Sequence, residues 1–393
     1  MRVCAIIAEF NPFHNGHAYL IEQVRNYGYT HIIVVMSGNF VQRGEPAIFS
    51  KDVRALTALK NNVNLVIELP VSKVIATAEK YANSGINLIS SLGCVDAIAF
   101  GIESENFESI LKIENALRTE SFSELLKINL SKGISFATAR EKSLKEIIGK
   151  ENLKDELKHG NNILAVEYVK AIKNMKLPFE ILGIKRLENP DFYLSASKIR
   201  EMINSKNINY EKYIPPFSHC LLKEKILKRE APANIFASNS ESAIISRLRG
   251  LDIQNISDLP DISEGIENRI FKEIKKSTSV NELLFNIKTK RYALSRIRRI
   301  ILSAFVGLTC KQSDNPLSYI RVLAMDNKGK EILKTIKQKS KLPIITKYKD
   351  VFKCSERVRE DFKKESIFND FYGLLTPRIL ECDSDKSFKL IKG

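Results

Sequence analysis

Apolar runs of four to six residues alternate with longer segments of helical periodicity along the first half of the chain. The apolar runs are Val3–Ala8, Ile32–Met36, Leu65–Leu69, Ala97–Phe100 and Phe179–Ile184. The helical segments are 17–27, 50–61, 73–91, 106–117, 161–175 and 195–204. Continuous apolar strands that alternate with helices are typical of βαβ units, so the pattern predicts an α/β fold with a Rossmann-like parallel sheet covered on both faces.

The pattern becomes mostly helical after residue 205. Consecutive prolines in the segment 213–217 cannot continue a helix, so we place a domain boundary close to this point. Helical periodicity then covers 218–229, 241–249, 266–276, 280–306 and 328–339, with short strands expected at Ile320–Ala324 and Pro343–Thr346. We therefore predict an α/β domain at 1–205 and a mostly helical C-terminal domain at 206–393.

Basic residues are concentrated in the second of these two parts. The 393 residues include 62 Lys and Arg against 46 Asp and Glu, a formal charge of +16. Residues 1–205 carry 25 basic and 23 acidic side chains, whereas residues 206–393 carry 37 and 23. This asymmetry suggests that one part performs chemistry and the other binds a polyanion. A solvated, lysine-rich surface would give the same composition.

The composition disfavours membrane and secreted classes. No apolar stretch approaches the roughly 18 residues that span a bilayer, and the apolar run at the start is short and ends at Glu9, unlike a signal peptide. The cysteines are far apart and form no CxxC pair, which is typical of reduced cytosolic thiols. We expect a cytoplasmic protein without a membrane partner, a disulfide-linked partner or a metal site. The cysteines are Cys4, Cys94, Cys220, Cys310, Cys354 and Cys382.

The segment most informative about chemistry is Glu9–Leu20, with the sequence EFNPFHNGHAYL. His14 and His17 lie beside Gly16 where the first strand gives way to the first helix. Ligands bind at the carboxyl ends of strands in open parallel sheets, and a helix N-terminus favours phosphate. Gly16 would let the backbone approach a ligand, and two imidazoles can donate hydrogen bonds to phosphoryl oxygens. Incidental histidines or a metal pair are the alternatives; metal is disfavoured because the other three histidines offer no cluster.

A second segment, Ser195–Arg200, follows the fifth predicted strand. Ser195 and Ser197 can cap the helix that begins there and can offer N–H and hydroxyl groups to phosphates. Arg200 adds a permanent positive charge suited to a leaving pyrophosphate. An ordinary capped helix with a surface arginine is the alternative, which the HxGH segment makes the weaker interpretation.

These two segments resemble the nucleotidyltransferase superfamily with the (H/T)xGH signature. Longer strings narrow the resemblance to the bacterial tRNA(Met) cytidine acetate ligase family over essentially the whole chain. The strings are Ala8–His17, Met36–Pro46, Leu65–Pro70, Phe100–Gly101, Asn161–Tyr168 and Thr289–Tyr292. The resemblance implies that ATP activates acetate to acetyl-adenylate. The acetyl group would then pass to the exocyclic amine of the wobble cytidine in elongator tRNA(Met).

The resemblance also implies site residues, with His14 and His17 as the catalytic pair facing the triphosphate. The chain departs from the family at Gly160, where Pro is usual, and at Ile102, where Ser is common. Lys185 is an alternative to Arg186 as a nucleotide contact. The implied ATP-binding residues are Ile7, Ala8, Glu9, Phe10, Asn11, Pro12, Phe13, His14, Asn15, Gly16, His17, Ala18, Tyr19, Leu20, Gly101, Asn162 and Arg186.

Two other features have a functional and a structural interpretation. The segment after the second strand offers Asn39, Gln42 and Arg43 as polar candidates for substrate or tRNA. A structured turn is the alternative, and we favour the site role. Glu68 interrupts an apolar strand, and a buried carboxylate needs a partner. We favour a structural salt bridge for Glu68.

The segment 288–299 has six cationic residues in a predicted helix. A basic helix face suits a phosphate backbone, and the family's tRNA specificity gives this face a partner. A solvated basic face is the alternative. Mg²⁺ commonly accompanies a triphosphate, but no acidic motif identifies its ligands. The candidate tRNA contacts are Lys288, Lys290, Arg291, Arg296, Arg298 and Arg299.

We therefore expect the range 1–205 to bind ATP and catalyse the reaction, and the range 206–393 to bind tRNA. A small-molecule cofactor adenylyltransferase is one alternative, but it leaves the basic half unexplained. A non-catalytic tRNA-binding protein on the same fold is another. A class I aminoacyl-tRNA synthetase shares the HxGH-type signature, but no amino-acid pocket can be identified.

Overall fold

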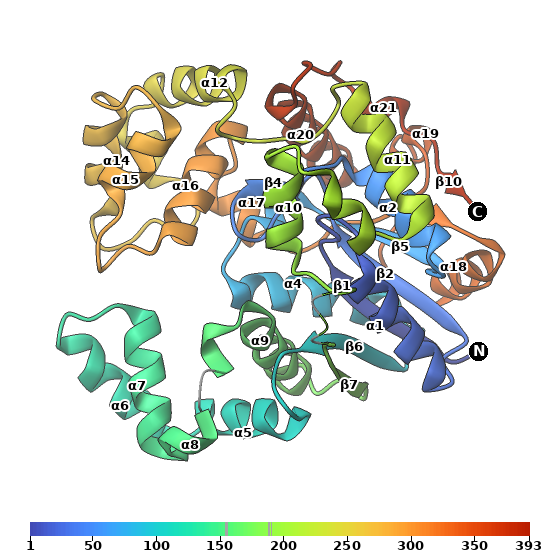
Figure 1. Cartoon of the computed structure of the whole chain (residues 1–393), viewed down its shortest axis with the longest axis horizontal. Coiled ribbons are helices and arrows are strands. Elements are labelled where there is room, and N and C mark those ends of the chain that lie inside the picture. Colours follow the sequence, from blue (N-terminus) through green and yellow to red (C-terminus); the bar gives the residue numbers. More distant parts are fainter. Residues whose placement is uncertain (154–155, 188, 190) are drawn as a thin grey trace.

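The computed structural model describes residues 1–153, 156–187, 189 and 191–393, and its central feature is one mixed sheet (Figure 1). Five of its strands are parallel neighbours in the order β5-β2-β1-β6-β7. The first strand in the chain is therefore central, and the chain winds outward from it in both directions, as in Rossmann folds. These strands are β1 (Val3–Ala8), β2 (His31–Ser37), β5 (Leu65–Leu69), β6 (Ala97–Ile102) and β7 (Glu180–Lys185).

Three further strands from the end of the chain complete the sheet. β8 (Ile320–Met325) pairs with β5 in the antiparallel direction, and β9 (Ile344–Ile345) and β10 (Ile391–Lys392) both pair with β8. A separate hairpin is formed by β3 (Phe40–Val41) and β4 (Glu45–Pro46). The α/β fold class is confirmed, and the sheet is mixed instead of purely parallel.

Helices cover both faces of the sheet and extend beyond it. In the first half they are α1 (Asn15–Asn26), α2 (Lys51–Lys60), α3 (Val71–Val74), α4 (Ala78–Ser91), α5 (Phe107–Leu117), α6 (Glu120–Ser131), α7 (Phe136–Ile148), α8 (Lys150–Leu153), η1 (Glu156–Lys158), α9 (Gly160–Asn174) and α10 (Ala196–Asn204). In the second half they are η2 (Ile208–Tyr213), α11 (Pro216–Leu227), α12 (Ser238–Arg249), α13 (Ile253–Ser257), α14 (Ile266–Ile274), α15 (Val280–Ile287), α16 (Leu294–Val306), α17 (Cys310–Asp314), α18 (Asn327–Lys339), α19 (Tyr348–Val351), α20 (Glu356–Tyr372), η3 (Gly373–Leu375) and α21 (Ser384–Ser387).

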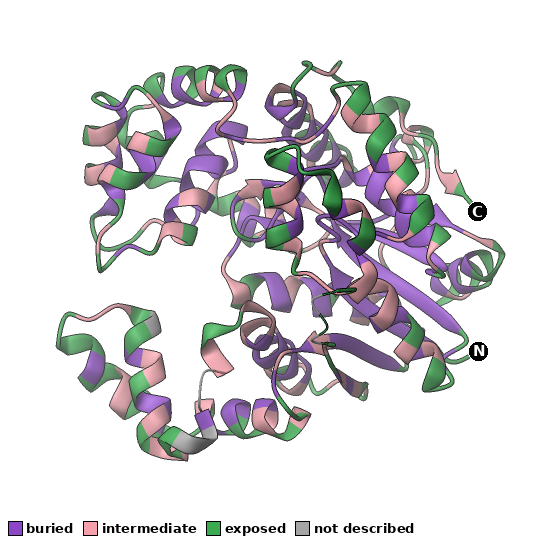
Figure 2. Ribbon diagram, viewed as in Figure 1, coloured by how far each residue is buried: buried purple, intermediate pink, exposed green. Residues whose placement is uncertain are grey.

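The two faces of the sheet carry separate apolar cores, because side chains of a strand alternate between its faces. On one face, Ile7 and Val35 pack with α4, α5, α9 and α18. On the other, Ile6 and Val34 pack with α1 and α2. The inner strands are buried along their whole length (Figure 2), as expected for a parallel sheet covered on both sides. This rigid arrangement places the ends of β1, β6 and β7 at one edge.

Helices α12 to α16 form a separate lobe, which lies at the upper left of Figure 1. Their Ile and Leu side chains make a third core, which Phe40, Val71 and Ile75 join from the α/β part. The lobe is therefore packed onto the α/β part near the β3–β4 hairpin. None of the helices in the described part of the chain is long and apolar enough to cross a membrane, and the six cysteines have free thiols.

The single helix expected at 280–306 is wrong. α15 ends at Ile287 and α16 begins at Leu294, so a loop separates them. The Thr289 hydroxyl accepts hydrogen bonds from the N–H groups of Arg291 and Tyr292, at 3.1 Å each. Such a local turn offers the backbone an alternative to the helix.

Most of the range 206–393 is helical, and its strands join the sheet of the first half. Ile320 and Val322 of β8 belong to the same core as the strands of the first half. The two short strands expected in this range exist, but they extend the N-terminal sheet. Sequence periodicity could not show this, because it predicts a strand without indicating its neighbour.

A buried cluster of four charges joins this C-terminal segment to the sheet. The Lys51 ammonium lies 2.8 Å from a Glu68 carboxylate oxygen and 2.6 Å from one of Asp385. The Arg321 guanidinium on β8 lies 3.5 Å from Glu68 and 3.1 Å from Asp385. Two anions between two cations compensate one another where solvent cannot. The salt bridge expected at Glu68 is therefore present.

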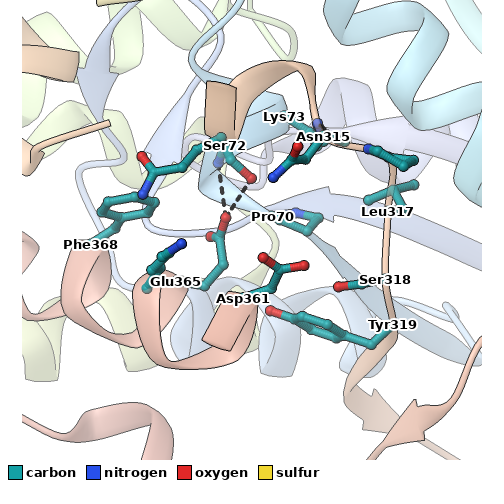
Figure 3. A pocket seen from close by; sticks show the side chains of 13 residues that line it. Pro70, Ser72, Lys73, Asn315, Leu317, Ser318, Tyr319, Asp361, Glu365 and Phe368 are labelled. Carbon is teal, nitrogen blue, oxygen red and sulfur yellow. Dashed lines mark hydrogen bonds between the residues drawn. The ribbon is translucent and has the colours of Figure 1, made fainter. Parts of the chain in front are cut away.

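Helix α20 is fixed to the end of β5 by a second buried carboxylate (Figure 3). Glu365 accepts hydrogen bonds from the N–H groups of Val71 and Ser72, at 2.7 and 3.1 Å, and from the Ser72 hydroxyl. Burial raises its pKa to about 7. Lys73 turns the other way and donates to the carbonyls of Ser313 and Asn315. The pocket beside these residues is small, about 40 Å³.

We expect Asp385→Asn to lower the free energy of unfolding by about 3 kcal/mol, because it leaves Lys51 and Arg321 with one buried anion between them. Chemical denaturation measures this value. Asp383→Asn is the matched control, since its ion pair with Lys386 is exposed and is expected to contribute nothing measurable. Equal stability of the two variants would contradict the role given to the cluster.

Candidate functional site

A cavity of about 730 Å³ lies at the carboxyl ends of β1, β6 and β7. In the five-strand order, β1 lies between β2 and β6, so the chain reverses its direction of winding here, and ligands bind at such points. The volume suits a nucleotide-sized ligand. The predicted site residues that line the cavity are Ile7, Ala8, Glu9, Phe10, Asn11, His14, Gly16, His17, Tyr19, Leu20, Gly101, Arg186, Ser195 and Arg200.

The two imidazoles are stacked at the start of α1, with ring centroids 3.8 Å apart. Nδ1 of His14 accepts a hydrogen bond from the Gly16 N–H at 3.1 Å, so this ring caps the helix. Nδ1 of His17 accepts one from the His14 N–H at 3.2 Å. A neutral imidazole with an accepting Nδ1 carries its proton on Nε2. Each ring therefore presents an Nε2–H donor for an anion.

Both imidazoles are neutral at physiological pH. Burial, followed by the charges of Arg186 and Arg200, lowers the pKa of His14 from 6.5 to about 3. Burial and the neighbouring His14 lower the pKa of His17 well below its ordinary value. Phe10 and Phe13 pack against the His17 ring, with ring centroids 4.9 and 5.6 Å from its centroid, and hold it in place. The pair supplies two fixed hydrogen-bond donors without adding charge, which suits phosphate groups whose charge changes during a reaction.

Gly16 is required by the histidine and not directly by a ligand. A Cβ at this position would lie 2.9 Å from Cε1 of His14. The side chain would therefore displace the capping imidazole. The close approach that Gly16 permits in this structure is between the backbone and His14, and its contact with a ligand stays a prediction.

Arg54, which sequence reasoning missed, organises the loops behind this site. Its buried guanidinium on α2 donates to the carbonyls of Glu9 and Ser37 at 2.7 and 2.9 Å, and also to those of Gly38 and Phe49. Burial lowers its pKa to about 10, so it remains charged. The sequence did carry a signal for this residue, because Arg54 is an arginine on a helix face whose other residues are mostly apolar.

Residues after β6 and β7 form the other wall of the cavity. Gly101 faces Arg186, whose guanidinium lies 3.3 Å from Glu103. Asn162 does not line the cavity: its amide accepts from the Glu103 N–H and donates to Glu156, so it fixes the loop after β6. Asn161, the preceding residue, lines the cavity instead.

Both basic residues at the end of β7 line the cavity. Lys185 forms an exposed ion pair with Glu105 at 2.6 Å, whereas Arg186 lies against Gly101. The role of Arg186 as the nucleotide contact stays a prediction, and its position is the more interior of the two.

The second signature lies where expected, at the start of α10. The Ser195 hydroxyl accepts from the Lys198 N–H as the helix cap, and Arg200 donates to the Asn11 carbonyl at 2.8 Å. Ser197 is exposed and is not part of the cavity lining. Arg200 thus connects the two signatures. Ser197 belongs to the second signature but does not line the cavity.

The remaining residues of the first segment support the lining residues. Asn15 donates to the carbonyls of Phe192 and Lys212, at 3.1 and 3.0 Å, and so holds the loop before α10 and the η2 turn after it. Pro12 and Phe13 are buried beneath the turn, and Ala18 packs against the core of this face.

The polar candidates after β2 divide into structural residues and one exposed cation. The Asn39 amide accepts from the Lys51 N–H, and the Gln42 amide donates to the Ala76 carbonyl. Both side chains therefore hold turns. Arg43 is exposed, and its guanidinium lies over Gly160, where a Cβ would lie 2.1 Å from it. The glycine that replaces the usual family proline leaves room for this contact.

The basic segment is divided by the loop between α15 and α16. Lys288, Lys290 and Arg291 are exposed in this loop. On α16, Arg296 pairs with Glu264 and Arg299 with Asp261, at 3.0 and 2.6 Å.

Arg298 connects the helical lobe to the α/β part. Its guanidinium pairs with Glu45 of the β3–β4 hairpin. The adjacent Gly44, with φ +76°, packs so closely on α16 that a Cβ would lie 2.4 Å from the Arg299 nitrogen. These arginines stabilise the lobe and its docking. In the loop, Arg291 lies 3.7 Å from Glu264 in an exposed ion pair, and Lys288 and Lys290 are exposed.

Among residues 1–153, 156–187, 189 and 191–393, no group of three His, Cys, Asp or Glu side chains is arranged to hold a metal ion. The histidine pair is engaged with backbone N–H groups through Nδ1, as described above. Its geometry is that of an anion site.

The stacked histidines, the adjoining Arg200 and the topology together define a nucleotidyltransferase of the HxGH type. Residues 1–384 match the model of the family described as HIGH Nucleotidyl Transferase. A tRNA(Met) cytidine acetate ligase of Caldanaerobacter subterraneus subsp. tengcongensis is 39% identical over 389 residues, with 95% of each chain covered. One of Thermoanaerobacter sp. is 40% identical over 394 residues with the same coverage. The chain belongs to the HIGH nucleotidyl transferase family and, within it, to the tRNA(Met) cytidine acetate ligases.

Solved structures agree with this assignment. A crystal structure of Thermotoga maritima TmcAL bound with alpha-thio ATP superposes with a TM-score of 0.91 at 29% identity, covering 100% of both chains. The apo form of the same protein gives the same TM-score at 28% identity. The family predicted from the sequence is thereby confirmed, and so is the fold.

We expect the low pKa of His14 to make folding pH-dependent. Between about pH 6.5 and about pH 3 the unfolded chain binds a proton that the folded site excludes, so stability falls as the pH falls through this window. The slope attributable to one such group is about 1.4 kcal/mol per pH unit. His14→Asn keeps a capping side chain and removes the titrating ring. Denaturant unfolding at several pH values should show a shallower slope for this variant, and an unchanged slope would contradict the assignment.

Proposed function

We propose that the chain is an ATP-dependent tRNA(Met) cytidine acetate ligase that acts in the cytoplasm. The observation that carries the proposal is the neutral, stacked histidine pair in a nucleotide-sized cavity, in a chain that matches ligases of this name over its full length. In the first step an acetate oxygen attacks the α-phosphorus of ATP, and pyrophosphate leaves. The product is acetyl-adenylate.

The residues of the cavity have distinct roles in that step. The Nε2–H groups of His14 and His17 stabilise the phosphate oxygens, and Arg200 neutralises the leaving pyrophosphate. Gly101 contacts the adenosine part of ATP and Arg186 is a further basic contact to the nucleotide; both line the opposite wall of the cavity. Mg²⁺ would enter with the triphosphate, because this ion is commonly held by substrate phosphates and water.

In the second step the exocyclic amine of the wobble cytidine of elongator tRNA(Met) takes the acetyl group. The tRNA must place one base in the cavity while its backbone contacts a basic surface. Lys288, Lys290 and Arg291 form such a surface in the exposed loop of the helical lobe. Arg43, at the edge of the hairpin that docks on this lobe, is a further exposed cation.

The proposal is tested by incubating the protein with ATP, labelled acetate and bulk tRNA. We expect label in tRNA that requires ATP, and we expect His14→Ala and His17→Ala to abolish it. Label exchange between pyrophosphate and ATP with a nucleotide-like acceptor, without any label in tRNA, would favour a cofactor adenylyltransferase. Normal tRNA binding without modification would favour a non-catalytic RNA-binding protein.

A second experiment locates the tRNA surface. The triple variant Lys288→Ala, Lys290→Ala, Arg291→Ala should weaken tRNA binding. The slope of log K against log salt concentration should become shallower by the contribution of up to about three phosphate contacts, each of which adds roughly 0.9 to the slope for duplexes. Acetate-dependent exchange of pyrophosphate into ATP should remain unchanged. A matched control removes three lysines of α18: Lys330→Ala, Lys334→Ala, Lys337→Ala. Equal losses in both variants would show that binding depends on overall charge and not on the loop.

A further inference from the structure

Among the residues that the structure describes, the carboxylates that line the cavity are those of Glu9 and Glu103, and they differ in how they are engaged. Glu103 lies 3.3 Å from Arg186 and 3.1 Å from His159, and it also accepts from the Asn161 amide. Glu9 accepts one hydrogen bond, to Oε1 from the Gln42 N–H at 2.9 Å. Among the described residues, Oε2 of Glu9 has no hydrogen-bond or ion-pair partner. This oxygen is available to a molecule in the cavity.

Glu9 is held rigidly although its second oxygen is unengaged. Its own carbonyl accepts from Arg54 at 2.7 Å, and the Gln42 that holds Oε1 is itself fixed by its bond to the Ala76 carbonyl at 2.7 Å. When the backbone and one carboxylate oxygen of a residue are already held in place, its side chain loses little conformational entropy on contact with a substrate.

The charged and titratable groups around Glu9 come from every neighbouring element. Cations face Glu9 from α10, from the β3–β4 hairpin and from α2. Tyr81 of α4 and Tyr168 of α9 are also near Glu9. The imidazoles at the start of α1 are neutral. Burial raises the pKa of Glu9, and Gln42 and the cations oppose that effect only in part. The carboxylate is therefore a better proton acceptor than an exposed one. The cations are Arg200, Arg43 and Arg54.

The two steps of the reaction differ in their need for such a group. Acetate attacks ATP as a carboxylate and releases no proton. The cytidine amine must lose a proton when it becomes an amide. The histidine pair cannot take this proton on the nitrogens it presents, because Nδ1 of each ring accepts a backbone N–H and Nε2 already carries hydrogen.

We propose that Oε2 of Glu9 accepts the proton that the cytidine amine loses during acetyl transfer, an inference that rests on the proposed ligase function. A bond forms between the amine nitrogen and the acetyl carbon. The bond from that carbon to the phosphate oxygen breaks, and AMP leaves with its electron pair. The proton passes from nitrogen to the Glu9 carboxylate and then to solvent.

Glu9→Gln tests this role, because the amide oxygen can still accept from the Gln42 N–H while the side chain can no longer accept a proton. The variant is supplied with synthetic acetyl-adenylate and tRNA, and transfer is followed in a single turnover over a range of pH. Acetate-dependent exchange of pyrophosphate into ATP is measured separately. We expect transfer to fall about 100-fold or more, as for loss of a general base, and to fall much further than exchange does.

The pH profile distinguishes proton acceptance from a structural role. Transfer by the unmodified protein should rise with pH as Glu9 ionises, and Glu9→Gln should lose this rise, whereas Glu9→Asp should retain it at a lower rate. Glu103→Gln is the matched control in the same cavity and should retain the rise even where its rates are lower. Equal losses of exchange and transfer in Glu9→Gln would overturn the inference and assign Glu9 to ATP or metal binding. If the unmodified protein transfers no acetyl group, the ligase function itself fails instead.

Discussion

The edge of the sheet that carries the candidate site depends on the hydrogen bonds of the buried Arg54 guanidinium. β1 and β2 end side by side, and their chains turn away into loops whose carbonyls can no longer pair within the sheet. Arg54 binds carbonyls from both loops, including those of Glu9 and Ser37. Unsatisfied carbonyls at this depth would each cost a substantial fraction of the protein's net stability. One cation thus fixes the direction in which the HxGH segment leaves the sheet.

The geometry of the site follows from that fixed departure. Once the chain leaves β1 at Glu9, the turn places His14 as the cap of α1 and stacks His17 upon it. Arg200 then binds the Asn11 carbonyl, which brings α10 to the same edge. The site is therefore assembled from backbone hydrogen bonds that exist without any ligand. Donors that are preorganised in this way can stabilise changing phosphate charge without reorganising during a reaction.

The strands of the α/β part and the HxGH segment could be predicted from the sequence because each depends on local patterning. β1 and β5 begin and end at the predicted residues, and the lining of the cavity includes most of the first segment. Pairings between distant residues could not be predicted in this way. Arg321 lies in β8 because Glu68 and Asp385 compensate its charge, and neither partner is near it in the sequence.

The basic segment shows a second kind of limit. Charge spacing alone suggested one helix face, whereas Thr289 turns the chain and divides the six cations between a loop and a helix. The arginines of α16 then have acidic partners that a count of charge along the sequence cannot reveal. Net charge correctly indicates that a surface is basic, but contacts decide which cations remain on it.

The antiparallel pairing of β8 with β5 has a consequence for how the protein is made. β5 lies next to β2 and emerges early during synthesis, but its outer edge is covered only when residues 320–325 have been translated. Until Asp385 follows, Lys51 and Glu68 lack the partners that complete their cluster. A nascent chain therefore exposes an unpaired edge strand together with charges that are buried in the folded protein. Chaperones recognise such a state, and it aggregates readily. Residues 320–325 and Asp385 must therefore be present before the edge of the sheet and its charge cluster can close.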